Sequence, residues 1–262
     1  MTQAQENPGY VDSKYLEILA EKLKPIKERS YALIHLEVGH RVLDVGCGPG
    51  IDTLPISKLV GSTGIVHGID YDVEMIEKAD QKARVAGVAD RVIHRHGDAL
   101  TLPYESDYFD SCRSERLFQH LSQPQRALSE MYRVTRPGGW IAVLDSDHSS
   151  LSIDTDDVDI EWRLRRFHAD RLFNGYSGRR LYGLFRRQQL VDITIECLPI
   201  CIMDYALERY ILAVDEAEKK AIAANVLTEE ELRNMHEKLL RSDKEGTFFG
   251  YVVVIIAAGR KP

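Results

Sequence analysis

The sequence predicts an α/β fold in which a largely parallel sheet carries helices on both faces. Short β-branched runs alternate with helical patterns along the chain, which is typical of such sheets. No internal repeat and no low-complexity linker interrupts this alternation. The 262 residues are 44% hydrophobic and 29% charged, a balance that suits one globular unit with a sizeable core. We therefore expect a single domain over residues 1–262.

The β-branched runs predict the strands, and helices fill the intervals between them. We expect strands at 41–45, 64–70, 91–97, 108–114, 140–146, 192–200 and 250–259. We expect helices at 13–37, 52–60, 73–86, 123–135, 157–173, 178–188, 204–224 and 228–242. Proline and glycine in "RPGGW" end one helix and restart extended chain. Thr228 and Glu231 form a capping-box pattern at the start of the last helix.

Composition argues against several kinds of protein. A net charge of −7 and a pI near 5.7 do not suit a protein whose main partner is nucleic acid. The four cysteines lack the paired spacing of a zinc site, so we expect reduced thiols and no metal centre. The N-terminus lacks the pattern of a secretory signal, and the apolar run "YVVVIIAA" is shorter than the ~20 residues that span a bilayer. We expect a cytoplasmic protein without a membrane span.

The stretch "HRVLDVGCGPGID", residues 40–52, places three alternate glycines between an apolar run and a helical pattern. Glycine tolerates positive φ and lets a ligand approach the main chain, so such a strand-to-helix turn suggests a bound cofactor. The dinucleotide fingerprint G-x-G-x-x-G does not fit, because its third glycine would fall on Ile51 or Thr53. What fits is an acid followed by glycines at alternate positions: Asp44, Gly46, Gly48 and Gly50.

This pattern, "VLDVGCGPG", resembles the first motif of class I S-adenosylmethionine-dependent methyltransferases. In that family the glycine-lined backbone can contact the methionine part of a cofactor that has no pyrophosphate. Further segments in the same order are similar to the family, among them "HGDAL", the "HL" turn and "RPGG". The resemblance is strong from residue 40 to residue 146 and looser beyond. It implies a Rossmann-like, seven-stranded, mostly parallel sheet whose last strand is antiparallel.

An acid follows each of the next two strands. Asp70 lies about 20 residues past the turn, where a carboxylate can accept both ribose hydroxyl hydrogens. The resemblance assigns the adenine amino group to Asp98 and the edge of the ring to Ala99. It also implies cofactor contacts from the residues beside these positions: Cys47, Tyr71, Met75, Gly97, Ser114 and Glu115.

Each of these features also has a plainer explanation. A glycine-rich turn can serve tight packing, Asp70 can cap the next helix, and Asp98 can close a turn. The two acids, however, follow successive parallel strands, and ligands of open α/β sheets bind at that edge. The combination favours binding of S-adenosylmethionine, with S-adenosylhomocysteine as the product.

Candidates for substrate contact follow the fourth and fifth strands: Glu115, Arg116, Gln119, His120, Asp145, Asp147 and His148. His148, expected beyond the fifth strand, is the first choice for a general base, because nearby carboxylates can orient its imidazole. The alternative is a solvated loop histidine. His120 is a second catalytic candidate, although such a residue more often packs or forms a hydrogen bond. Arg116 indicates either a polar or anionic substrate or an ion pair with a neighbouring carboxylate.

We expect an N-terminal helical lid at 1–38 and a cofactor-binding core at 39–150. Two helical caps are expected at 151–190 and 204–245, and the closing strands at 191–203 and 249–262. In similar enzymes the N-terminal segment closes over the cofactor, where Tyr15 or Arg29 would reach the methionine carboxylate. The arginine-rich segment 161–190 suits either anion or nucleic-acid recognition, but the carboxylates of "DTDDVDIE" favour internal pairing.

The sequence therefore predicts an enzyme, a methyltransferase that moves a methyl group to O, N or C of a small-molecule metabolite by in-line displacement. It most resembles the group that contains the ubiquinone and menaquinone C-methyltransferases and natural-product methyltransferases. One alternative is a methyltransferase for RNA or protein. Another is a cofactor-binding relative with a regulatory or non-methylating role. The sequence leaves the acceptor and the oligomeric state open, with a homodimer as one option.

Overall fold

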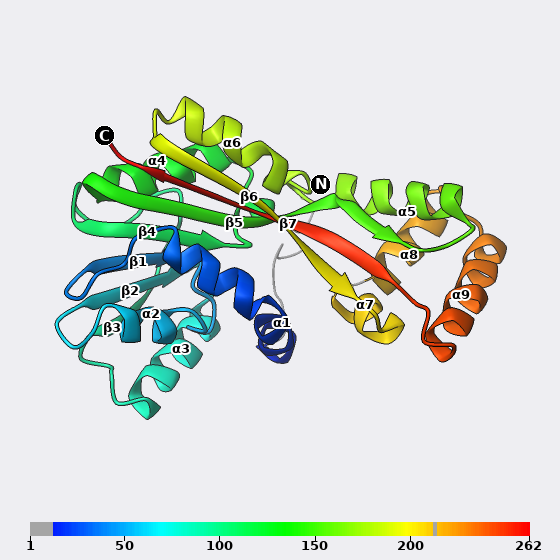
Figure 1. Ribbon diagram of the computed structural model, residues 1–262, viewed down its shortest axis with the longest axis horizontal. Coiled ribbons are helices and arrows are strands. Elements are labelled where there is room, and N and C mark those ends of the chain that lie inside the picture. The colour runs from blue at the N-terminus through cyan, green and yellow to red at the C-terminus, as the bar shows by residue number, and fades with distance from the viewer. Residues whose placement is uncertain (1–12, 212–213) are drawn as a thin grey trace, which may run out of the picture.

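The computed structural model describes residues 13–211 and 214–262, which form a seven-stranded sheet with the order β3-β2-β1-β4-β5-β7-β6 (Figure 1). The strands are β1 (Arg41–Val45), β2 (Ile65–Asp70), β3 (Val92–His96), β4 (Phe109–Glu115), β5 (Thr135–Ile153), β6 (Val191–Ile202) and β7 (Gly250–Arg260). Strands β1 to β5 pair in parallel, and β7 runs antiparallel to both β5 and β6. The expected mostly parallel sheet with an antiparallel last strand is confirmed.

Helices cover both faces of the sheet. Figure 1 shows α1 (Ser13–Ala32), α2 (Thr53–Leu59) and α3 (Val73–Val85) on one face, with α4 (Pro124–Val134) and α6 (Ser177–Arg187) on the other. The alternation of side chains along β1 explains the two layers. Val42 packs in one buried cluster with Ile56 of α2, whereas Leu43 packs in another with Leu128 of α4 and Phe185 of α6. Both faces of the central strands are therefore buried.

Strand β5 is much longer than the predicted 140–146. It pairs with β4 only as far as Leu144, but it pairs with β7 as far as Asp147 and again from Ser152. The long antiparallel β7 therefore extends β5 past the parallel part of the sheet. The expectation that His148 lies beyond the strand end is wrong, because it lies inside β5 where the register with β7 shifts.

A helical lobe surrounds the extended ends of β5, β6 and β7, on the right of Figure 1. It consists of α5 (Val158–Arg171), α7 (Tyr205–Ile211), α8 (Val214–Ala223) and α9 (Glu229–Lys244). Its core includes Leu151 of β5, Leu164 of α5 and Met235 of α9. The helix predicted at 204–224 is described as α7 and α8, on either side of residues 212–213, which lie outside the described part.

Helix α1 also differs from its prediction, which ran to residue 37. It ends at Ala32, and His35 has a positive φ of 48°, a backbone conformation that does not continue a helix. The other predicted helices and strands begin and end within a few residues of the observed ones. Residues 1–12 of the expected N-terminal lid lie outside the described residues.

The capping box at the start of α9 is confirmed. Thr228 Oγ1 accepts a hydrogen bond from Glu231 N at 3.1 Å, and Glu231 Oε2 accepts one from Thr228 N at 2.8 Å. We expect Thr228→Ala to lower the free energy of unfolding by about 1 kcal/mol, because a helix N–H loses its partner. Urea unfolding measures the change, with Thr228→Ser as the control that keeps the hydroxyl. Equal stability of the alanine and serine variants would contradict this account.

Candidate functional site

The glycine turn, residues 46–50, joins β1 to α2 at the carboxyl edge of the sheet. Gly46, Gly48 and Gly50 have φ values of 75°, 51° and 71°, a region that favours glycine. Gly46 N donates a hydrogen bond to Ile69 O at 2.8 Å. A Cβ atom on Gly50 would lie 2.9 Å from Cβ of Ala79 in α3. Packing against α3, as well as backbone conformation, therefore selects glycine at position 50.

Asp70, the last residue of β2, faces this turn. Its Oδ2 accepts a hydrogen bond from Gly48 N at 2.8 Å, and its Oδ1 accepts one from Asp72 N at 2.9 Å. Burial raises the pKa of Asp70, while these backbone donors act in the opposite direction. The glycine turn thus holds the Asp70 carboxylate in place. A residue that only capped α3 would not need this bond to Gly48. Capping of α3 falls instead to Asp72, which accepts from two backbone N–H groups.

The tip of β3 lies beside Asp70. Gly97 N donates a hydrogen bond to Asp70 O at 2.9 Å, so the two strand tips are joined. Asp98 is exposed, and its Oδ1 accepts a hydrogen bond from Leu100 N at 2.8 Å. The structure therefore brings both predicted carboxylates to neighbouring strand tips.

The flanking residues that the sequence singles out lie around these tips. Tyr71 is 73% exposed, and its ring centroid is 5.8 Å from that of His96. Met75 is buried in α3, and Ala99 is half-buried beside Asp98. Cys47 is buried in the turn, and burial raises the pKa of its thiol well above the usual range. This thiol is therefore protonated at neutral pH and is no nucleophile.

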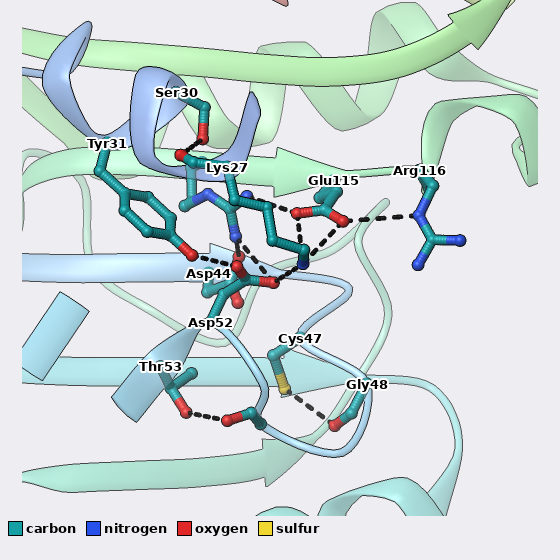
Figure 2. A network of polar contacts seen from close by, with 12 residues as sticks. Lys27, Ser30, Tyr31, Asp44, Cys47, Gly48, Asp52, Thr53, Glu115 and Arg116 are labelled. Carbon is teal, nitrogen blue, oxygen red and sulfur yellow. Dashed lines mark hydrogen bonds and ion pairs between the residues drawn. The ribbon is translucent and has the colours of Figure 1, made fainter. Parts of the chain in front are cut away.

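A buried charge cluster lies next to the glycine turn and consists of Lys27, Asp44, Asp52, Arg113 and Glu115 (Figure 2). The Arg113 side chain is 1% exposed, and it donates to Asp44 Oδ1 and to Glu115 Oε2, each at 2.9 Å. Lys27 Nζ lies 2.7 Å from Asp52 Oδ2 and 2.8 Å from the Glu115 carboxylate. The cluster therefore ties α1, β1, the start of α2 and β4 together.

The charges of this cluster balance when Arg116 is included. Arg116 Nε lies 3.4 Å from Glu115 Oε1, so three cations face three carboxylates. Burial raises the pKa of Asp44 to about 7, although Arg113 opposes the shift. Burial also acts to raise the pKa of Asp52, but Arg113 and Lys27 hold it well below its usual range. Buried charges of this kind are tolerated only when each has its partner.

Three residues predicted to contact a cofactor belong to this part of the site. Asp44 and Glu115 lie at the carboxyl ends of β1 and β4, but both carboxylates are engaged by Arg113. Ser114 is buried, and its Oγ has no hydrogen-bond partner among the described residues. Contact of these three side chains with a cofactor remains a prediction.

The acceptor-side candidates come together in a histidine cluster, which consists of Gln119, His120, His148 and His168. Gln119 and His120 lie in the short 3-10 helix η1 (Phe118–His120), which follows β4. Gln119 Oε1 is 2.9 Å from His148 Nε2, and Gln119 Nε2 is 3.0 Å from His120 Nε2. The ring of His168, from α5, has its centroid 5.6 Å from that of His148. Gln119 therefore links two histidines that are well separated in the sequence.

Burial keeps these histidines uncharged. It lowers the pKa of His148 to about 4 and that of His168 to about 3, and it also lowers the pKa of His120. The positive charge of Arg116 acts on His120 and His148 in the same direction. Of the two interpretations of Arg116, the ion pair with Glu115 is observed. The alternative that His148 is a solvated loop residue is not observed, because its Nδ1 atom is buried.

Residues of α1 are engaged within the protein. Arg29 donates a hydrogen bond to Glu196 of β6 at 2.9 Å, so its guanidinium is directed to β6 and away from the glycine turn. The Tyr31 hydroxyl donates to Asp52 in the charge cluster. The side chain of Tyr15, the other candidate for the methionine carboxylate, lies outside the described residues.

Pairing of the arginine-rich segment with "DTDDVDIE" is observed at Arg163 with Asp159 and at Arg165 with Glu161, whereas its other ion pairs use carboxylates outside that run. These other pairs are Arg163 with Glu231, Arg165 with Glu208, Arg166 with Asp170, and Arg179 with Asp147. These arginines are therefore partly neutralised and do not form an uncompensated basic surface.

A cavity of about 970 Å³ lies between α1 and α2. It reaches Gly50 and Ile51 of the glycine turn, and Lys27 and Asp52 of the charge cluster line it. The glycine turn is therefore open to a cavity on the face of the sheet that α1 and α2 cover.

Comparison with known proteins agrees with this geometry. Residues 43–143 match the family model described as "Methyltransferase domain". An uncharacterised 37.1 kDa protein of transposon TN4556 from Streptomyces fradiae is 32% identical over 205 residues, or 76% of this chain and 59% of that protein. The demethylmenaquinone methyltransferase of Lactiplantibacillus plantarum is 35% identical over 120 residues, or 46% of this chain and 51% of that protein. Residues 43–143 are thus similar to a methyltransferase domain.

The fold of this chain is shared with solved structures. The YcgJ protein of Bacillus subtilis superposes with a TM-score of 0.63 at 22% identity, over 92% of this chain and 98% of that one. The chain spans about half the length of the curated relatives that it matches. Among the described residues of the chain, no group of three or more His, Cys, Asp and Glu side chains is arranged to hold a metal ion. None of its described helices is both long and apolar enough to cross a membrane.

The sequence did not indicate several residues of the candidate site. Lys27, Asp52 and Arg113 were not assigned a role, and neither was His168. Arg113 did carry a signal, because a charged residue in the middle of a central, otherwise buried strand requires buried partners. His168 carried none, since only the packing of α5 brings it to β5.

Removal of Arg113 tests the charge cluster. We expect Arg113→Met to lower the free energy of unfolding by about 3–5 kcal/mol, because buried carboxylates lose their partner. Arg136→Met is the matched control: it breaks the more exposed ion pair with Asp110 and should cost at most about 1 kcal/mol. Denaturant unfolding compares the two variants. Equal losses would show that the charge cluster does not stabilise the fold.

Acidification tests the neutral histidines. An unfolded histidine titrates near 6.5, so below that pH the unfolded chain binds protons that buried His148 and His168 do not. The free energy of unfolding should then fall with pH by up to about 1.4 kcal/mol per pH unit for each histidine. His168→Gln should make this fall shallower between pH 6.5 and 4.5, as measured by urea unfolding. An unchanged slope would contradict the burial of an uncharged His168.

Proposed function

We propose that the chain is an S-adenosylmethionine-dependent methyltransferase that transfers a methyl group to O, N or C of a small-molecule acceptor. The hydrogen bond between Gly48 N and Asp70 carries this proposal, because it holds a carboxylate against a glycine turn at the edge where open α/β sheets bind ligands. Asp98 on the next strand tip and the match to a methyltransferase domain support it.

The residues at this edge suit the chemistry of an adenosyl group. Each oxygen of Asp70 accepts one backbone N–H and keeps a second lone pair, so the carboxylate can still accept from the two ribose hydroxyls. Asp98 Oδ1 is used by Leu100 N, which leaves Oδ2 for the adenine amino group. Tyr71 would shield the ring from solvent. The glycine turn would contact the methionine part through its main chain.

Catalysis in this site depends mainly on positioning. When bound, S-adenosylmethionine supplies an electrophilic methyl carbon. Holding an acceptor atom in line with it can lower the barrier by about 7–11 kcal/mol, whereas a general base adds roughly 3–5 kcal/mol. We place the acceptor beside the histidine cluster, where β4 ends and β5 continues past it. Helix α5 contributes His168 to this cluster, so we propose that the helical lobe covers the acceptor as a cap.

The acceptor can be found by isotope labelling. The full chain is incubated with a cell extract and S-adenosylmethionine carrying a deuterated methyl group, and products are read by mass spectrometry. A labelled small molecule, with release of S-adenosylhomocysteine, is the expected result. Label confined to RNA or protein, or cofactor binding without any transfer, would contradict the proposed activity.

Asp70 is the residue to alter first. We expect Asp70→Ala to weaken S-adenosylmethionine binding by about 1–3 kcal/mol, because ribose hydroxyls lose their acceptor. Titration calorimetry measures this. Asp72→Ala is the control, since Asp72 caps α3 and its side chain has no assigned ligand contact. An unchanged affinity of the Asp70 variant would remove this residue from the site.

A further inference from the structure

Gln119 is held rigidly at the carboxyl edge of the sheet. It is 8% exposed, and its N–H donates to Asp145 Oδ2 at 2.8 Å. Its C=O accepts from Asn174 N at 3.0 Å, and the side chain of Asn174 donates to Phe118 O at 3.2 Å. With both backbone groups fixed, the side-chain amide has little freedom to choose other partners.

This amide lies between two imidazoles and makes a different kind of bond to each. The amide oxygen is placed 2.9 Å from His148 Nε2, and because an oxygen only accepts, this placement requires a hydrogen on Nε2. The amide nitrogen can only donate, so His120 Nε2, at 3.0 Å, must present a lone pair. The neutral forms of the two rings are therefore opposite. His148 carries its hydrogen on Nε2, and His120 carries its hydrogen on Nδ1.

The remaining nitrogen of His148, Nδ1, is then an unprotonated acceptor. It is buried and has no hydrogen-bond partner among the described residues. A buried acceptor left without a partner costs free energy, so such an atom in a candidate site is a place where a ligand can donate.

The groups that face His148 keep its ring neutral and fixed. His120 and Arg116 approach from the end of β4, His168 from α5, and Asp147 from its own strand. Of these, only Asp147 favours the charged ring. The backbone N–H of His148 donates to Gly175 O at 3.0 Å.

The histidine cluster is also connected to the glycine turn. Leu117, the residue before η1, is so close to Gly46 that a Cβ atom there would lie 3.1 Å from Leu117 Cβ. The chain that carries Gln119 and His120 therefore starts in contact with the turn proposed to hold the methionine part of the cofactor.

We propose that Gln119 is a positioning residue that fixes the tautomers of His148 and His120, so that His148 Nδ1 receives the proton of a protic methyl acceptor, a hydroxyl or a neutral amine. This inference rests on the proposed function. As the acceptor oxygen or nitrogen bonds to the methyl carbon, the carbon–sulfur bond breaks and its electron pair goes to sulfur. The acceptor proton passes to Nδ1, which leaves His148 as an imidazolium beside Asp147, the carboxylate that favours the charged ring. The geometry thus favours O- or N-methylation over C-methylation.

Nitrogen-15 NMR of the histidine rings tests this without knowledge of the acceptor. The protein is saturated with S-adenosylhomocysteine and titrated with phenol, which can donate a hydrogen bond, or with anisole, which cannot. We expect His148 Nδ1 to show the shift of an unprotonated nitrogen and to respond to phenol but not to anisole. A protonated Nδ1, or equal responses to both probes, would overturn the inference.

Variants of Gln119 separate positioning from folding. Gln119→Met removes both amide contacts and should weaken phenol binding about fivefold or more, with a mixture of His148 tautomers. Gln119→Glu keeps an acceptor for His148 Nε2, so it should preserve the His148 tautomer and reverse that of His120. If Gln119→Met does not fold, Gln119→Glu still tests the role of Gln119. Gln188→Met, at an amide that bonds Ser129 and Gln125, is the matched control. Unchanged tautomers in both Gln119 variants would overturn the role of Gln119.

Calorimetry with S-adenosylhomocysteine distinguishes the two proposals. If the compound does not bind the unaltered protein, the proposed function fails. If it binds and His148 Nδ1 carries a proton, only the inference about Gln119 fails.

Discussion

The burial of Arg113 is the constraint on which this site depends. A guanidinium in the middle of the central strand β4 cannot lose its charge, so the fold must bring carboxylates to it. Asp44, Glu115 and Asp52 come from three different elements, and Lys27 of α1 neutralises two of them from the other side. The glycine turn runs between Asp44 and Asp52. Its ends are therefore fixed by the same charges that hold β4 and α1 in place.

Two polar layers meet at the carboxyl edge of the sheet. One consists of the glycine turn with the carboxylates at the tips of β2 and β3, and it suits an adenosyl cofactor. The other is the histidine cluster, where β4 ends and β5 continues past it, and it suits an acceptor. Contact between Leu117 and Gly46 joins the two layers. The helical lobe takes part through His168 of α5, which links a distant part of the chain to the proposed chemistry.

Local sequence was enough to predict the glycine turn, Asp70 and Asp98, because backbone conformation and strand ends are encoded by neighbouring residues. It did not predict the partners of Arg113, since ion pairs between distant elements depend on how those elements pack. It also could not give the length of β5, which is set by pairing with β7 near the end of the chain. His148 was selected for its nearby carboxylates, yet its side chain is bound by the amide of Gln119.

A structure of the protein crystallised with S-adenosylhomocysteine tests the central claim most directly. The account predicts the adenosyl group at the tips of β2 and β3, with ribose hydroxyls within hydrogen-bond distance of Asp70 and the amino-acid part over residues 46–50. An empty turn at saturating ligand, or a ligand bound elsewhere with Asp70 left facing only its backbone donors, would contradict it.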